Sequence, residues 1–174
     1  KFKKKLSISQ GRHLRKIKNK IQLFPAKNWK KELKLFKLTK LNYIEWVVSA
    51  DNIKKNPIYQ IDGHQIIKKF LKINKIKCRS VDLDFIVKEN PLNLINNKLE
   101  LFLKKIEIIA ENSYKIGVKY LIFPFLENSS PNTNSKISKL INIFNKLHKK
   151  ISGKILLLIE TDIAPKKLLK IMNK

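Results

Sequence analysis

Hydrophobic positions along the chain fall into two patterns, short continuous runs and longer segments with helical spacing. The short runs predict strands, and several are apolar without interruption, as in parallel strands covered on both faces. Helical stripes lie between them, and the clearest ends at Gly117. The strand candidates span residues 5–10, 43–48, 76–85, 119–126 and 154–160.

The helical stripes carry recognisable start signals. Asn28 and Ser135 are candidate caps, and Asp62 with Gln65 three residues later has the spacing of a capping box. A short fifth helix is predicted after Pro165. The stripes are Trp29, Leu33, Phe36 and Leu41; Ile66, Ile67, Phe70, Leu71 and Ile73; Leu99, Phe102, Leu103, Ile106, Ile109, Ala110 and Ile116; and Ile137, Leu140, Ile141, Phe144 and Leu147.

The order of these elements predicts an α/β protein with about five strand–helix units. Strand-to-strand steps of roughly 33 to 43 residues suit right-handed crossovers between parallel strands. A closed (βα)₈ barrel takes eight units and about 250 residues. We therefore expect either a smaller open sheet or the first five of eight barrel units, and self-association through the exposed edge strands.

Composition adds a strong positive charge to this picture. The chain has 174 residues and a net charge of +26, but its 39 basic residues comprise 36 Lys and only 3 Arg. Proteins that grip phosphate usually use Arg, and the lysines here are dispersed over the polar sides of the predicted helices. Codon bias accounts for this better than a nucleic-acid surface, although the charge alone leaves that alternative open.

Several functional classes lack their usual signals. One cysteine, Cys78, excludes an internal disulfide framework, and the sequence contains no glycine-rich nucleotide motif and no G-x-S-x-G motif. The longest apolar runs are far shorter than the roughly 20 residues of a membrane span. The basic start lacks the apolar segment of a signal peptide, so we expect a cytoplasmic protein with no membrane partner.

The few acidic residues are placed more selectively than the basic ones. Six of the thirteen fall in, at or just past predicted strands, where ligands gather in parallel α/β proteins. Carboxylates there suit a divalent cation or the hydroxyls of a sugar, although single members also fit helix caps or ion pairs. The six are Glu45, Asp82, Asp84, Glu127, Glu160 and Asp162.

Other side chains at the same end are candidate substrate contacts. Arg12 follows the first strand next to Gly11 and has the charge to hold an anion such as a phosphate. His64 begins the second long helix within reach of this rim, although a lone histidine is more often structural. Trp46, with Phe123 and Phe125, has the chemistry of a sugar-stacking wall or of ordinary core.

Six segments occur in an order that resembles the bacterial sugar phosphate isomerase/epimerase-like proteins of the xylose isomerase-like TIM-barrel superfamily. The resemblance covers residues 1–174 as one partial barrel domain. It is most specific at 43–58 and 120–130. The segments are SQGR at 9–12, IQLFPAKNWKKEL at 21–33, YIEWVVSADNIKKNPI at 43–58, FIVKENPL at 85–92, YLIFPFLENSS at 120–130 and LLLIETD at 156–162.

The resemblance implies a divalent metal, Mn²⁺ or Mg²⁺, at the carboxyl-end rim and a sugar or sugar phosphate as substrate. The metal-binding glutamate that ends the fifth strand in the family corresponds to Glu160, which is also the catalytic candidate. The other ligands of the family come from strands 6 to 8, which lack counterparts here, so we expect a chain truncated relative to the family: either the first five units of an isomerase or epimerase, or an inactive product. The alternative is a nucleic-acid-binding or endonuclease IV-like protein that uses its basic surface.

Overall fold

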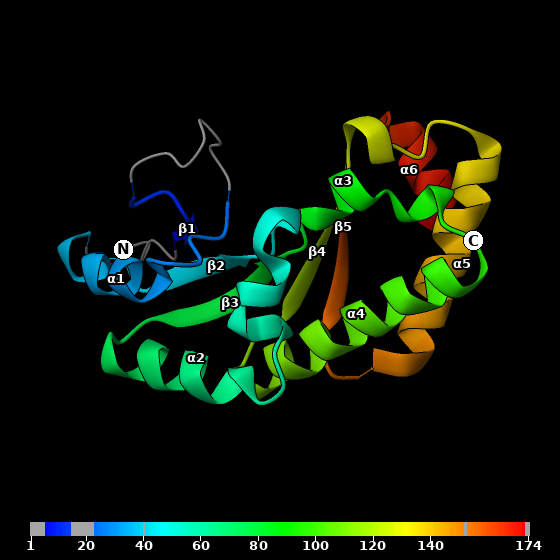
Figure 1. Ribbon diagram of the computed structural model, residues 1–174. Helices are drawn as coiled ribbons and strands as arrows, with labels where there is room; N and C mark the ends of the chain where they lie inside the picture. The colour runs from blue at the N-terminus through cyan, green and yellow to red at the C-terminus, as the bar shows by residue number, and fades with distance from the viewer. Residues whose placement is uncertain (1–5, 15–22, 40, 152, 173–174) are drawn as a thin grey trace.

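The computed structural model describes residues 6–14, 23–39, 41–151 and 153–172, and its centre is a sheet of five parallel strands (Figure 1). The strands lie in chain order, with β1 and β5 at the edges. This confirms the predicted parallel sheet, with each strand a little shorter than its sequence pattern. The strands are β1 (Ser7–Ser9), β2 (Tyr43–Val47), β3 (Lys77–Asp82), β4 (Tyr120–Phe125) and β5 (Leu156–Thr161).

Helices follow the strands as the apolar stripes predict, with one additional helix. The α-helices are α1 (Trp29–Leu35), α2 (Gly63–Ile73), α3 (Phe85–Glu89), α4 (Asn96–Lys115), α5 (Asn134–Ile151) and α6 (Pro165–Met172). Short 3₁₀ turns are η1 (Phe36–Leu38), η2 (Ala50–Lys55), η3 (Pro57–Tyr59), η4 (Pro91–Asn93) and η5 (Glu127–Ser129). None of the helices in these described ranges is long and apolar enough to cross a membrane.

Some local predictions at element ends are wrong, among them the Ser135 cap, because α5 already begins at Asn134 and the Lys136 N–H donates to the Thr133 hydroxyl. The strand predicted over 76–85 stops at Asp82, because the Phe85 N–H donates to the Val48 carbonyl and the chain turns into α3. The capping box at Asp62 does not form within the described chain, since this residue has φ of 55° and its side chain makes no capping bond. Gly117 does end α4, with φ of 88°.

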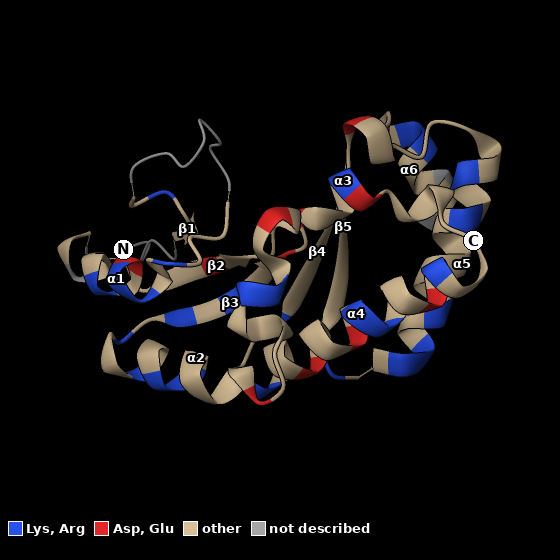
Figure 2. Ribbon diagram, viewed as in Figure 1, with Lys and Arg blue, Asp and Glu red and all other residues tan. Residues whose placement is uncertain are grey.

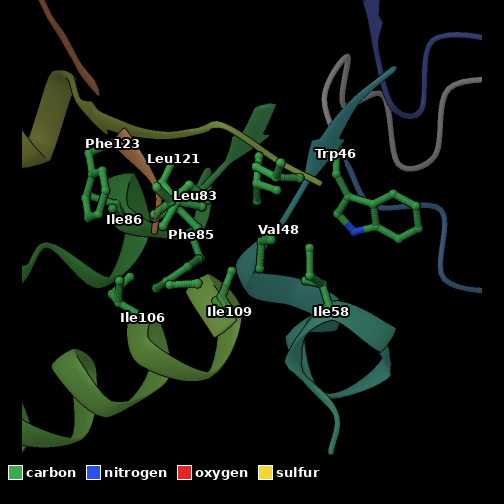
Figure 3. Packing of buried hydrophobic residues seen from close by; sticks show 14 of the residues in the cluster. Trp46, Val48, Ile58, Leu83, Phe85, Ile86, Ile106, Ile109, Leu121 and Phe123 are labelled. Atoms are coloured by element: carbon green, nitrogen blue, oxygen red, sulfur yellow. The ribbon is translucent and has the colours of Figure 1, made fainter. Parts of the chain in front are cut away.

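Alternate side chains of the strands pack against the helices on one face of the sheet. In register across this face lie Trp46, Val81, Leu121 and Leu157. The first three are fully buried, and Ile106 and Ile109 of α4 pack into the same core (Figure 3). Burial at this interface supplies about 25 cal/mol per Å² of apolar area.

The other face of the sheet is open at β5, which differs there from the prediction of strands covered on both sides, whereas Val47 and Asp82 on the same face are buried. On β5, Leu156 and Leu158 are 62% and 42% exposed, whereas the alternate residues Leu157 and Ile159 are half-buried. Side chains that alternate along a strand point to opposite faces. The helices therefore cover one side of β5, and no described element covers the other.

A register shift between Ile44 and Glu45 interrupts the regular pairing of β2 with β3. Ile44 pairs with Cys78, but the next residue, Glu45, pairs with Ser80. Arg79 is passed over, and its guanidinium lies 4.9 Å from the centre of the Tyr43 ring. Because of this shift, Ser80 and not Arg79 lies beside Glu45 of β2.

Candidate functional site

A row of side chains crosses the open face of the sheet at the level of Glu45. It runs in register from Ser9 through Glu45, Ser80 and Tyr120 to Leu156. The Ser80 hydroxyl donates to Glu45 Oε2 at 2.9 Å. The row carries polar side chains over the first three strands, an aromatic ring with a hydroxyl at Tyr120 and an apolar side chain at Leu156, so it offers hydrogen-bonding groups beside a hydrophobic surface.

The next row towards the carboxyl ends contains Asp82. This residue ends β3, lies in register with Val47 and Ile122, and is only 4% exposed. Its backbone carbonyl accepts a hydrogen bond from the Val48 N–H at 2.8 Å, which fixes the end of the strand. Asp84 lies two residues later as the residue before α3 and is half-buried.

The carboxyl ends of β4 and β5 are joined by Asp162. Its carboxylate accepts hydrogen bonds from the Ser130 hydroxyl at 2.5 Å and from the Glu127 N–H at 3.1 Å. The bond from Ser130, followed by the one from the Glu127 backbone, lowers the pKa of Asp162. This bridge holds Glu127, with φ of 49°, beside the end of β5.

Glu160 lies near this bridge, in the last part of β5. It is exposed and pairs with Pro124 of β4. By strand alternation its side chain shares the open face with Leu156 and Leu158. Two of the predicted site residues, Glu127 and Glu160, are therefore brought to the same end of the β4–β5 pair.

The loop after β1 is held by a buried carboxylate that the sequence analysis did not single out. Glu32 of α1 is fully buried, and its Oε1 accepts the N–H groups of Gly11 at 2.6 Å and His13 at 3.4 Å. Burial raises the pKa of Glu32 to about 7. The sequence signal for its burial is that Glu32 lies within the apolar stripe of Trp29, Leu33 and Phe36. Arg12, between the two bonded residues, is exposed at the carboxyl end of β1.

Trp46 is placed in the core and not at the rim. Its indole is fully buried, packs against Trp29 with ring centres 5.6 Å apart, and donates to Asn56 Oδ1 at 2.9 Å. The Asn56 amide in turn donates to the Val47 carbonyl. Phe123 and Phe125 are also fully buried, so these aromatic rings do not form an accessible stacking wall.

His64 joins two helices. Its Nδ1 lies 3.0 Å from Asn112 Oδ1 of α4, and the Asn112 amide donates to the carbonyls of Ile58 and Gln60. These bonds tie the start of α2 to α4 and to η3. The structure therefore gives His64 a connecting position, apart from the Glu127–Glu160 group.

The carboxylates of the rim do not form a complete divalent-metal site by themselves. Over residues 6–14, 23–39, 41–151 and 153–172, no three His, Cys, Asp or Glu side chains are grouped so that they could hold a metal ion. Hard divalent cations take about six or more oxygen ligands. The donor set of the described chain is thus insufficient, and Glu160 is a single candidate ligand.

Comparison with solved structures defines the fold class. Three of the matching structures are the apo form of 3-keto-D-glucoside 4-epimerase YcjR from E. coli, a xylose isomerase domain protein from Planctomyces limnophilus, and a xylose isomerase-like TIM-barrel protein from Mycobacterium smegmatis in complex with magnesium. Their TM-scores are 0.55, 0.56 and 0.51, at 12%, 10% and 12% sequence identity. The chain has the fold of part of a TIM barrel, and in this it is similar to these xylose isomerase-like proteins and to the sugar epimerase.

The match is long on this chain and partial on the others. It covers 75%, 81% and 86% of this chain, but 49%, 53% and 53% of the three structures in the same order. The chain thus spans about half the length of the structures it matches. No protein-family model and no curated protein matches the sequence.

Proposed function

We propose that the carboxyl-end rim belongs to a sugar or sugar-phosphate isomerase or epimerase. The observation that carries the proposal is the exposed Glu160 carboxylate on the open face of β5, in a fold shared with a sugar epimerase. A carboxylate in this position has the chemistry to take a proton from a sugar carbon next to a carbonyl and to return it.

Neighbouring polar groups supply substrate contacts in this proposal. Glu45, Asp82 and Glu127 accept hydrogen bonds from sugar hydroxyls, and Arg12 at the end of β1 holds a phosphate where the substrate carries one. Leu156 and Leu158 give the same face an apolar strip for the C–H side of a sugar ring. Trp46 and His64 are left out, since their polar atoms are engaged in the core and between helices.

In this proposal Glu160 supplies one ligand to a divalent metal, Mn²⁺ or Mg²⁺. The Mycobacterium smegmatis neighbour was crystallised with magnesium, which supports this choice of metal class. The described residues do not complete the ligand set, and in this proposal the Glu160 carboxylate itself is the group that moves the proton. We further propose a cytoplasmic location, and self-association of the chain through its open edges.

Proton exchange in the full-length protein tests the proposal. Keto sugars, with and without phosphate, are incubated in D₂O, and NMR follows the loss of the proton next to the carbonyl. We expect Glu160→Gln to slow this exchange by about 10²-fold or more. The matched control is Glu100→Gln, which removes an exposed carboxylate of α4 that pairs with Lys146. Unchanged exchange in Glu160→Gln would overturn the site assignment.

A further inference from the structure

A hollow of about 410 Å³ opens at the amino-terminal end of β3 and at the entry to β4. This is the end of the strands opposite to the proposed catalytic rim. Its lining contains five cations, contributed by the last turns of α2, by β3 and by the residue before β4. The lining residues are Lys68, Leu71, Lys72, Ile76, Lys77, Cys78, Arg79, Ile116, Gly117 and Lys119. We call this site the basic hollow.

The cations of the basic hollow differ from the lysines on the outer helices. On α4 and α5, Lys146 and Lys150 pair with Glu100 and Glu107 at 2.8 and 2.5 Å, so blue and red positions adjoin there (Figure 2). None of the ion pairs in the described part of the chain involves a cation of the basic hollow, and no acidic residue lines it. Its charge is therefore available to an external anion.

Helix ends do not account for this grouping. The partial negative charge at the C-terminus of α2 explains a lysine such as Lys72. It does not explain Lys77 and Arg79, which belong to β3, or Lys119, whose N–H donates to the Arg79 carbonyl at 2.9 Å. Contact with Tyr43 also holds the Arg79 guanidinium in place. Cations from three separate parts of the chain thus lie around one concavity.

The surface between the cations determines the class of ligand. Leu71 and Ile76 are 5% exposed, and Ile116 is half-buried, so these side chains give the basic hollow an apolar floor. Its volume lies within the range of small-molecule sites, about 300–1,000 Å³. Lysine ammonium groups bind phosphate as point charges. We propose that the basic hollow binds an organic polyphosphate, with its phosphates against the cations and its apolar part on this floor.

Titration calorimetry at about 150 mM salt, where long-range attraction is screened, tests the proposal. The probes are ATP, inorganic tripolyphosphate and adenosine, each without metal. We expect saturable binding of ATP, weaker binding of tripolyphosphate, and none of adenosine. Equal affinity for ATP and tripolyphosphate would overturn the role of the floor, and absence of saturable ATP binding would overturn the site.

Matched variants separate the basic hollow from net charge. Lys68→Gln/Lys72→Gln removes two lining cations and should weaken ATP binding about tenfold. The control Lys69→Gln/Lys104→Gln removes two exposed cations that do not line it and should change the affinity less than about twofold. If both double variants lost the same ATP affinity, the binding would depend on net charge alone and the proposal would be contradicted. The same conclusion would follow if duplex DNA displaced ATP and both variants lost the same affinity.

Discussion

Asp162, one residue after β5, accepts a hydrogen bond from the Ser130 hydroxyl and so fastens the loop after β4 to the loop after β5. The same carboxylate accepts the Glu127 N–H. Two loops that are 32 residues apart in sequence are thereby kept in one arrangement at the proposed rim. The exposed Glu127 depends on this contact for its placement.

Asp162→Asn should loosen the 127–130 loop. The amide lacks the charge of the carboxylate and has one accepting oxygen in place of two, so the charge-assisted bonds from Ser130 and Glu127 are weakened. We expect hydrogen exchange at the Glu127 amide to become about tenfold faster, since its protecting bond is weakened. Mass spectrometry of peptides spanning the loop provides the measurement. Glu100→Gln serves as the control, and equal exchange in wild type and Asp162→Asn would contradict the bridge.

Glu32→Gln should change how stability depends on pH. The pKa of Glu32 is raised from 4.5 to about 7, so the folded state holds its proton more tightly than the unfolded state. This favours folding below pH 4.5 and is progressively lost as the pH rises to about 7. The full effect is on the order of 3 kcal/mol.

Urea unfolding at pH 5 and pH 8 measures this effect. Wild type should lose more stability than Glu32→Gln between the two values, because the variant has no carboxylate to ionise. Glu111→Gln is a suitable control, because ion pairing with Lys154 lowers the pKa of that exposed carboxyl. If wild type and Glu32→Gln lost the same free energy of unfolding between pH 5 and pH 8, the raised pKa of Glu32 would be contradicted.

Asn56→Ala should strongly destabilise the chain. The Asn56 side chain accepts from the Trp46 indole and the Ile58 N–H and donates to the Val47 carbonyl. Removing it leaves buried polar groups without partners, at a cost of about 3 kcal/mol or more in the free energy of unfolding. Denaturation followed by tryptophan fluorescence reports the change, with the exposed Asn142→Ala as the control. A loss no larger than that of the control would contradict this network.

Leu156→Lys/Leu158→Lys should reduce self-association of the chain. These leucines are exposed on the open face of the edge strand β5, and charge on an edge strand opposes pairing with another copy. Analytical ultracentrifugation should show fewer associated species than in wild type at the same concentration. Leu101→Lys, at an exposed position of α4, controls for added charge alone. A monomeric wild type would contradict the prediction.

Most of the architecture was predictable because its signals are local and repeated. The continuous apolar run at 155–159 and the stripe on α4 mark a strand and a helix without reference to the rest of the chain. The third strand was extended too far because Leu83 and Phe85 are apolar and buried, yet belong to the turn into α3. A hydrophobic pattern predicts which residues are buried. It does not predict the hydrogen bond from the Phe85 N–H to the Val48 carbonyl, which accompanies the end of β3.

The candidate site was predictable only as a set of strand ends. Glu160 lies in the last part of β5, and Glu127 and Asp162 come just after β4 and β5, so their neighbourhood follows from parallel pairing. The fully buried state of Trp46 depends on Trp29 and Asn56, which are distant in sequence or lie in an irregular turn. Glu32 was missed because a carboxylate among apolar residues has no motif, and its partners are backbone groups of another loop.

The shifted pairing of β2 and β3 has a chemical consequence for the open face. With regular pairing, Glu45 would lie opposite Arg79, and a guanidinium fork would bind its carboxylate in two places. Because Arg79 is passed over, the Ser80 hydroxyl lies opposite Glu45, and the Arg79 guanidinium lies against the Tyr43 ring. A one-residue slip in the sheet thus exchanges a self-neutralising ion pair for a carboxylate whose remaining lone pairs are available to hydroxyl groups.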